Sequence, residues 1–459
     1  MLYRIHRVSM QQRLVRDDLA GTFSAGAGRA ELVGIEVENG LVDPVTGCSV
    51  PYGGEHGALA LLDAIVREMN GAPLLDGAYA VGVQLPNGAS FTLETGGALE
   101  YSSVPWGGLA LAVSAARADL LHAAAIADRI GIALLSGACL PFTPENRIPW
   151  LPKPRVGVMR RYFRRLGESG EHADAVMGLT LSTQVSLDYV SAEDFIDKAR
   201  LHVLASPVVA ALSVNSPIAG GELCGVLSRR MQYWQKFDPR RCGVLDFALN
   251  DNASAMDFVD WAVKLPMIYR NVAGTHVAAP GRSFADLMRD GFGDGTWPTR
   301  DDWDLHLCQL WPQLRPRHTL ELRAADGLPW PHFPAVPAMW VGLTYDPAVR
   351  AEARALLAEL TAAQLESSVD DIATKGLAAL VGPHQVADLG HELLRLARRG
   401  LENRVAAGAD PAGILSLLEP LEQVDEGGET FADKCITSWQ GELRQSPAAY
   451  VRKYRVPVG

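Results

Sequence analysis

Four runs of the chain combine a strand-like alternation with acidic residues on one face. The runs are ELVGIEVENG (31–40), SFTLETGGALEYSS (90–103), GLTLSTQVSLDY (178–189) and HTLELRAADG (318–327). Because side chains alternate between the two faces of a strand, residues two apart point the same way. The first run therefore places Glu36 and Glu38 together, opposite an apolar face. If the four runs are neighbours in one sheet, one surface collects these carboxylates: Glu36, Glu38, Glu94, Glu100 and Glu321.

Two interpretations compete for these acidic strands. For any one strand, the ordinary interpretation is a half-buried strand whose polar face meets water. However, the acidic residue is Glu in three of the four runs, and Glu has low strand propensity. Crowded carboxylates also repel one another unless cations neutralise them. Carboxylate oxygens suit Mg²⁺ or Mn²⁺, which commonly bind nucleotide phosphates as well. The pattern therefore favours a site where a divalent metal ion binds phosphate.

A cationic set accompanies the carboxylates. The run PKPRVGVMRRYF supplies Lys153 and Arg155, SRRMQYW supplies Arg230 and Trp234, and Arg323 follows Glu321 by two residues. Arginine forks bind carboxylates and phosphates with two hydrogen bonds, although surface solubility is the alternative role for any one arginine. Together the acidic and cationic groups predict a site for Mg²⁺-ATP and an anionic substrate.

The composition and the absence of several common motifs exclude some classes of protein. The 459-residue chain carries a net charge of −11, which argues against a non-specific nucleic-acid binder. It contains no GxxxxGK[ST], GxGxxG, HExxH or GxSxG motif. Its six cysteines have neither CxxC nor zinc spacing, which is typical of a reducing compartment. We see no secretory signal, and prolines interrupt the longest uncharged stretch. We therefore expect a cytoplasmic monomer or homodimer with small-molecule substrates and no nucleic-acid or membrane partner.

The elements that must position these residues predict an α+β fold. We divide the chain into a polar N-terminal segment (1–30), a catalytic α+β body (31–345) and a helical C-terminal part packed on the same domain (346–459). Apolar spacing predicts helices at 107–130, 350–365, 385–406 and 411–423. Strands before residue 345 and helices after it indicate helices packed on one side of a largely antiparallel sheet.

At these residues the chain resembles the glutamate–cysteine ligase family, in its plant and bacterial branch. Each motif alone is weak, but eight of them stand in the family's order, and the similarity covers roughly residues 31–445. The motifs are GIEVE (34–38), TLETGGALEYSSVP (92–105), PKPRVGVMRRYF (152–163), TQVSLD (183–188), NSP (215–217), SRRMQYWQKFDPRRCG (228–243), LPM (265–267) and LELRAADGLPW (320–330).

The resemblance implies a glutamine-synthetase-like antiparallel sheet that forms a funnel, with helices behind it and a helix-rich C-terminal third. It implies that ATP phosphorylates the γ-carboxylate of glutamate and that an amine, cysteine by default, then attacks the γ-glutamyl phosphate, as in glutathione biosynthesis. The metal ligands would be Glu36, Glu38, Glu94, Glu100, Gln184 and Glu321. Our candidates for catalytic contacts to the phosphate or γ-carboxylate are Arg155 and Arg323, and we expect Lys153 and Arg323 to bind ATP. Arg230 and Trp234 would hold a substrate carboxylate.

Departures from the family pattern concentrate near the implied amino-acid pocket. Val156 stands where plant-type members usually have an aromatic residue, Leu179 where they have Arg, and Ser186 where they have Asn. Losing a polar contact from such a pocket can switch specificity. We count Val156 and Ser186 among the substrate-binding residues. Two alternatives to a cysteine ligase stay open: the same chemistry with another amino-acid acceptor in secondary metabolism, and a non-catalytic relative that binds nucleotide or amino acid.

Overall fold

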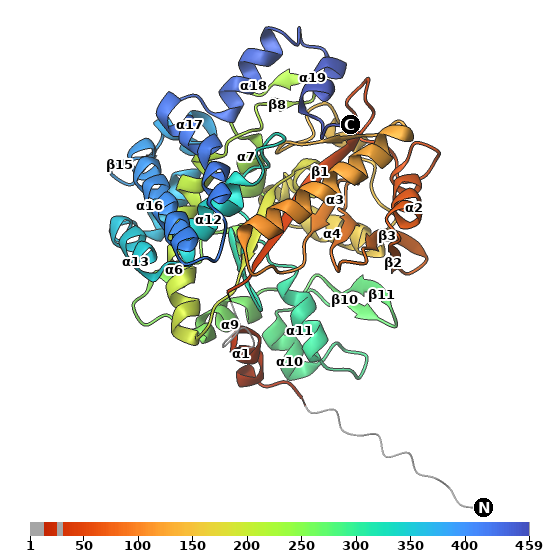
Figure 1. Ribbon diagram of the computed structural model, residues 1–459. Helices are drawn as coiled ribbons and strands as arrows, with labels where there is room; N and C mark the ends of the chain where they lie inside the picture. Colours follow the sequence, from red (N-terminus) through yellow and green to blue (C-terminus); the bar gives the residue numbers. More distant parts are fainter. Residues whose placement is uncertain (1–12, 25–30, 459) are drawn as a thin grey trace, which may run out of the picture.

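One nine-stranded sheet organises the molecule, whose computed structural model describes residues 13–24 and 31–458 (Figure 1). Eight strands follow the order β12-β13-β7-β1-β5-β4-β3-β2, and β6 pairs with the far end of β1. Every pair of strands in this sheet is antiparallel, as predicted. The strands are β1 (Val33–Val42), β2 (Ala72–Asp76), β3 (Tyr79–Gln84), β4 (Ser90–Leu93), β5 (Leu99–Ser102), β6 (Ala133–Leu135), β7 (Thr183–Leu187), β12 (Leu314–Pro316) and β13 (Leu320–Leu322).

The register of the central strands brings the four acidic runs together. Within β1, Glu36 lies opposite Gln184 on one side and Ser102 on the other, and Glu38 lies opposite Glu100. Glu321 of β13 lies opposite Ser186 of β7. The alternating residues of β1 (Val33, Ile35 and Val37) are buried in the core behind the sheet. The expected clustering of carboxylates on one face is therefore confirmed.

Helices cover the apolar face of the sheet. α3 (Leu109–Arg129) contacts β1 and β6, and α12 (Ala335–Thr344), in which every residue is buried, contacts β7 (Figure 1). α12 also crosses α16 (Val386–Ala406) at unusually short range. A β-carbon on Gly400 would lie 1.9 Å from the carbonyl oxygen of Gly342, so this crossing requires glycine.

The remaining helices pack around this core. They are α1 (Arg16–Ser24), α2 (Ala58–Glu68), α4 (Pro154–Arg164), α5 (Ala173–Leu179), α6 (Ala192–Leu212), α7 (Arg229–Gln235), α8 (Pro239–Cys242), α9 (Ala255–Val263), α10 (Phe284–Asp290), α11 (Arg300–Leu307), α13 (Pro347–Leu356), α14 (Ala362–Ser367), α15 (Val369–Lys375), α17 (Glu419–Gly427), α18 (Phe431–Gln440) and α19 (Pro447–Tyr454). Three small hairpins join them: β8 (Ile218–Ala219) with β9 (Glu222–Leu223), β10 (Tyr269–Val272) with β11 (Thr275–Ala278), and β14 (Leu380–Val381) with β15 (His384–Gln385).

Two of the four predicted helices match the structure closely, and two do not. The helices expected at 107–130 and 385–406 are α3 and α16. The single helix expected at 350–365 is wrong, because Thr361 caps a new helix and separates α13 from α14. The segment 411–423 begins as a 3₁₀ turn (Ala412–Leu417) and becomes helical only at α17.

Two further features bear on the sequence expectations. Among the described residues α3 alone is long and apolar enough to span a membrane by length and composition, and its buried face packs against the sheet and α2. Within the predicted segment 1–30, the helix α1 docks on α9, and Thr22 accepts a hydrogen bond from Trp303 Nε1 (3.0 Å). Residues 1–12 and 25–30 lie outside the described residues, and the three-part division of the chain stays a prediction.

Candidate active site

Four half-buried carboxylates share the polar face around β1. Glu38 accepts hydrogen bonds from Ser182 Oγ (3.0 Å) and Gln184 Nε2 (3.1 Å), and Glu100 accepts one from Thr92 Oγ1 (3.2 Å). Burial, followed by the charge of Glu321, raises the pKa of Glu36 to about 7. Burial and the charge of Glu94 raise the pKa of Glu38 to about 7 as well. The pKa of Glu100 rises well above its ordinary value, through burial and the charges of its neighbours. This zone therefore carries more negative charge than its protein partners neutralise.

The β4–β5 turn delivers Glu94 to this zone. Glu94 directly follows β4, and the side chain of Thr95 donates a hydrogen bond to the carbonyl of Met177 in α5. A β-carbon on Gly96 would lie 2.3 Å from the Cα of Gly178, so only glycine lets the turn approach α5 so closely. The Gly96-Gly97 pair thus serves the positioning of an acidic side chain.

Glu321 has a very different environment. It is fully buried, and its two oxygens accept hydrogen bonds from Arg315 (2.6 and 3.0 Å), Arg317 (2.7 Å) and Arg323 (2.5 Å). Burial alone would raise the pKa of Glu321, but the three guanidinium groups hold it well below its usual range. Arg323 also donates a hydrogen bond to Gln184, and Gln184 donates one to Glu38. Arg323 and Gln184 therefore connect Glu321 to Glu38.

A buried aspartate organises three of the sequence motifs. Asp326 Oδ2 accepts hydrogen bonds from Asn215 N (2.9 Å), Ser216 Oγ (3.1 Å) and Ser228 Oγ (2.9 Å). Its other oxygen lies 3.5 Å from Nη1 of Arg230, within ion-pair range. Ser228 also caps α7 by accepting from the backbone of Met231. The NSP loop, the start of α7 and the end of the LELRAADG run therefore meet at one carboxylate.

Arg230 and Trp234 project from α7 over the carboxylate face. Arg230 is 4% exposed, and its Nη2 donates to the carbonyl of Arg323 (2.9 Å). The guanidinium groups of Arg230 and Arg323 lie 6.0 and 5.8 Å from the Trp234 ring centroid. Neither Nε of Arg230 nor Nε1 of Trp234 has a hydrogen-bond partner among the residues that the structure describes, although both atoms are buried. Two donors at this point are therefore available to a ligand.

The other predicted residues are placed as follows. Lys153 is buried, donates to the carbonyl of Leu93, and has its pKa lowered to about 8 by burial and by Arg155. Arg155, in the first turn of α4, is half-buried and has no hydrogen bond or ion pair within the described part of the chain. Val156 is 3% exposed, and Ser186 is half-buried opposite Gly34 and Glu321.

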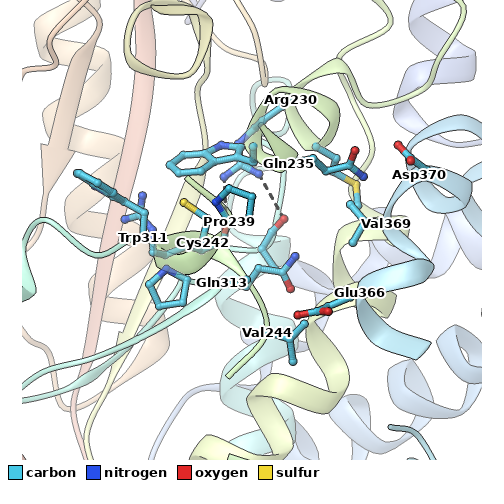
Figure 2. A pocket seen from close by; sticks show the side chains of 16 residues that line it. Arg230, Gln235, Pro239, Cys242, Val244, Trp311, Gln313, Glu366, Val369 and Asp370 are labelled. Atoms are coloured by element: carbon cyan, nitrogen blue, oxygen red, sulfur yellow. Dashed lines mark hydrogen bonds between the residues drawn. The ribbon is translucent and has the colours of Figure 1, made fainter. Parts of the chain in front are cut away.

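Two cavities meet at four shared residues. The inner cavity, about 80 Å³, reaches Glu38, Glu94 and Ser182. The outer cavity has a volume of about 380 Å³, and its lining includes Glu366 and Asp370 (Figure 2). Both cavities are lined by Arg230, Trp234, Trp311 and Arg323. Val156, Ser186, Lys153 and Arg155 line neither of them.

The donor set fits a divalent cation in its chemistry. Hard carboxylate oxygens with raised pKa values form an uncompensated anionic patch. Across the described ranges 13–24 and 31–458, no group of three or more His, Cys, Asp or Glu side chains is arranged to hold an ion by itself. Mg²⁺ commonly binds through only one or two carboxylates, with water and substrate phosphates completing the shell. The pairs Glu38 with Glu100 and Glu36 with Gln184 meet that requirement by register.

Several site residues escaped the sequence analysis. Arg315 and Arg317 share the alternation of Glu321 and Arg323 across a short hairpin, and that spacing would have found them. Asp326 lies inside a recognised motif, but no neighbouring residue in the sequence indicates that it binds Asn215, Ser216 and Ser228. Trp311, Glu366 and Asp370 line a cavity through tertiary packing alone.

Comparisons with known proteins show which proteins this chain resembles in sequence and in fold. The chloroplastic glutamate–cysteine ligase of Brassica juncea is 31% identical over 84% of this chain and 74% of that protein. Glutamate–cysteine ligase B of Oryza sativa subsp. japonica is 32% identical over 82% of this chain and 74% of its own length. The crystal structure of glutamate–cysteine ligase from Francisella tularensis in complex with AMP shares the fold (TM-score 0.50, 14% identity, 94% and 91% of the two chains).

These similarities define an enzyme of the carboxylate–amine ligase class. The model of glutamate-cysteine ligase family 2 (GCS2) matches residues 32–448. The chain belongs to this family, and the resemblance noted in its sequence motifs is thereby confirmed.

Proposed function

We propose that the protein ligates the γ-carboxylate of L-glutamate to the amine of an amino acid, with cysteine as the default acceptor, at the expense of ATP. One observation carries the proposal: at the junction of two cavities, a group of carboxylates with raised pKa values meets two buried donors, Arg230 Nε and Trp234 Nε1, that have no partner among the described residues. The family to which the chain belongs supplies the reaction class.

The reaction balances in two steps. A γ-carboxylate oxygen of glutamate attacks the terminal phosphorus of ATP, and ADP leaves with the bridging oxygen. The acceptor nitrogen then attacks the acyl carbon of the γ-glutamyl phosphate, inorganic phosphate leaves, and the nitrogen loses a proton. Neither step needs a nucleophilic protein side chain, so the protein's work is positioning and electrostatics.

The residues divide this work by their charge. Arg230, with free Nε and a rigid anchor at Asp326, holds an amino-acid carboxylate beside Trp234. Arg155, which has no ion-pair partner in the described structure, and the buried Lys153 offer positive charge to phosphate oxygens near Glu94. Mg²⁺ or Mn²⁺, when bound, would neutralise the phosphate charge. Glu36, Glu38, Glu94, Glu100 and Gln184 would hold it.

Glu321 fits the metal role least well. Both of its oxygens are already taken by three arginines, so its present contacts favour an organising role for Arg323. Its ligation of a metal stays a prediction.

The test is an ADP-release assay with glutamate, Mg²⁺-ATP and a panel of amino acids, with the products weighed by mass spectrometry. We expect glutamate-dependent ADP release and a product whose mass equals that of glutamate plus acceptor minus water. A reaction without glutamate is the control. If no acceptor supports ADP release above that control, the proposed function is wrong.

A further inference from the structure

Arg230 is held at two points by one buried carboxylate. Its guanidinium group lies 3.5 Å from Oδ1 of Asp326, which is its only charged partner among the described residues. The other acceptors of this group are the carbonyl oxygens of Ala324 (3.3 Å) and Arg323 (2.9 Å). The backbone N–H of Arg230 donates to Oγ of Ser216 (3.1 Å), and this hydroxyl in turn donates to Oδ2 of Asp326 (3.1 Å). Asp326 therefore fixes the side chain of Arg230 directly and its backbone through one serine.

The helix that carries Arg230 is tied to the same carboxylate. Ser228 caps α7 by accepting a hydrogen bond from the backbone N–H of Met231 (3.2 Å), and its own hydroxyl donates to Oδ2 of Asp326 (2.9 Å). The backbone N–H of Asn215 donates to that oxygen as well (2.9 Å). Because α7 has only seven residues, its internal hydrogen bonds stabilise it weakly, and these contacts fix where it begins.

The position of Asp326 keeps it away from any ligand in the two cavities. Asp326 is 1% exposed and lines neither cavity, whereas Arg230 lines both (Figure 2). A long side chain loses rotamer freedom when it binds a ligand, and a side chain that is already fixed loses less. A carboxylate that fixes Arg230 before the substrate arrives therefore favours binding without touching the substrate.

We propose that Asp326 is a positioning residue for amino-acid binding. It holds the guanidinium group and the backbone of Arg230 in the place where Arg230 meets a substrate carboxylate, and Ser216 connects it to that backbone. The inference rests on the proposed ligase function. It adds Asp326 and Ser216 to the residues that determine the KM for an amino acid, although neither residue lines a cavity.

Asparagine cannot replace Asp326 in this arrangement. Both oxygens of the carboxylate face donors: Oδ2 accepts from three groups, and Oδ1 faces Arg230. An asparagine amide has one acceptor oxygen and one NH₂ group that only donates. In Asp326→Asn, either Arg230 or the backbone N–H of Asn215 therefore faces an amide nitrogen, and neither of them can accept a hydrogen bond from it.

The experiment compares Asp326→Asn with Asp410→Asn. Asp410 is a matched control because it is also buried, accepts a hydrogen bond from the backbone of Ala110 (2.9 Å) and pairs with Arg404 (2.8 Å), but lines neither cavity. Both variants should lose stability in thermal unfolding. Only Asp326→Asn should raise the KM for one amino-acid substrate, glutamate or cysteine, by roughly tenfold. The KM for ATP should stay within about twofold of the wild-type value in both variants.

A double-mutant cycle with Arg230→Lys tests whether Asp326 acts through Arg230. Lysine lacks the planar fork that Asp326 orients. In the Arg230→Lys background, Asp326→Asn should therefore raise the same KM by less than about twofold. Equal increases in the two backgrounds would overturn the inference, because Asp326 would then act independently of Arg230.

Ser216→Ala keeps the test decisive if Asp326→Asn does not fold. It removes the hydroxyl between Asp326 and the backbone of Arg230 and leaves the ion pair in place. We expect a rise of about threefold in the same KM. An unchanged KM for both amino acids in Ser216→Ala would then overturn the inference.

The remaining outcomes separate the inference from the proposed function. An unchanged KM for both amino acids in a folded Asp326→Asn variant would leave Asp326 with a structural role alone. A lowered KM would mean that Asp326 competes with the substrate carboxylate for Arg230. Either result overturns the inference while the ligase function stands. Absence of glutamate-dependent ADP release in the wild type would mean that the proposed function fails, and the inference with it.

Discussion

The two ends of the polar sheet face treat their carboxylates in opposite ways. Glu321 is fully buried, and three arginines neutralise it and hold its pKa low. Two strands away, Glu36 and Glu38 form no ion pair with a described residue. Nearby arginines lower their pKa values, but burial and neighbouring acids outweigh this effect and raise the pKa of each to about 7. All three side chains belong to one sheet, in which β7 lies between β13 and β1.

This difference distinguishes carboxylates that stabilise the fold from carboxylates that are suited to bind a ligand. A carboxylate that the protein itself neutralises stabilises the fold and orients its partners. A carboxylate left uncompensated destabilises the ligand-free protein, and it persists where a bound cation supplies the missing charge. The carboxylates Glu36, Glu38 and Glu100 are therefore the better candidates for binding a ligand. Glu321 with its three arginines is the better candidate for holding Arg323 in place.

The largest effect is expected where the compensated end is broken. Glu321→Gln leaves three guanidinium groups crowded around a neutral amide, and removing one partner of a buried ion pair costs about 3–5 kcal/mol. Urea unfolding in the absence of nucleotide and metal measures this loss. Glu94→Gln is the control, and its free energy of unfolding should stay near that of the wild type. Equal destabilisation of both variants would erase the distinction between the two ends.

The uncompensated end should show the reverse pattern. Glu36→Gln or Glu94→Gln should lower kcat by about 10²- to 10³-fold, the usual loss when one electrostatic contact to a developing charge is removed. The measurement is Mg²⁺-dependent ADP release, with circular dichroism as the check on folding. Activity close to wild type in both variants would contradict the assignment of these carboxylates to a metal-phosphate site.

Arg230 stands between the two ends and tests the amino-acid site. Arg230→Lys keeps a positive charge beside Asp326 but loses the planar fork. Because hydrogen bonds between charged groups contribute about 1.5–3 kcal/mol, the KM for one amino-acid substrate should rise roughly 10- to 100-fold. The KM for ATP should change much less. An unchanged KM for every amino acid would remove Arg230 from the pocket.

The strand alternation predicted that these carboxylates would cluster, because alternation is a local pattern. The alternation of one strand places Glu36 and Glu38 on the same face, and the acidic run 90–103 forms the two paired strands β4 and β5 that carry Glu94 and Glu100 into the site. The run at 178–189 was misread at its start, because residues 173–179 form α5 and the strand begins only at Thr183. Alternation of apolar residues over a few positions does not distinguish a strand from a short buried helix.

The parts that were missed depend on distant segments. Neutralisation of Glu321 by Arg315 and Arg317 is the exception, because these arginines lie on the same short hairpin and their spacing could have revealed them. The outer cavity combines α7, α8, the segment before β12 and the α14–α15 junction. No local spacing connects Trp311 to Glu366, so only the packing of the C-terminal helices onto the sheet creates this site.

The smallest effect is expected at Arg155, which belongs to neither end. Because it has no hydrogen bond or ion pair within the described residues, Arg155→Gln should change the free energy of unfolding by less than about 0.5 kcal/mol. Its half-buried charge should still matter for an anionic ligand, with a rise of about fivefold in the KM for ATP or glutamate. Thermal unfolding and steady-state kinetics on one preparation measure both. A clear loss of stability would show that Arg155 supports the fold, and the cationic side of the site would then depend on Lys153 and Arg323.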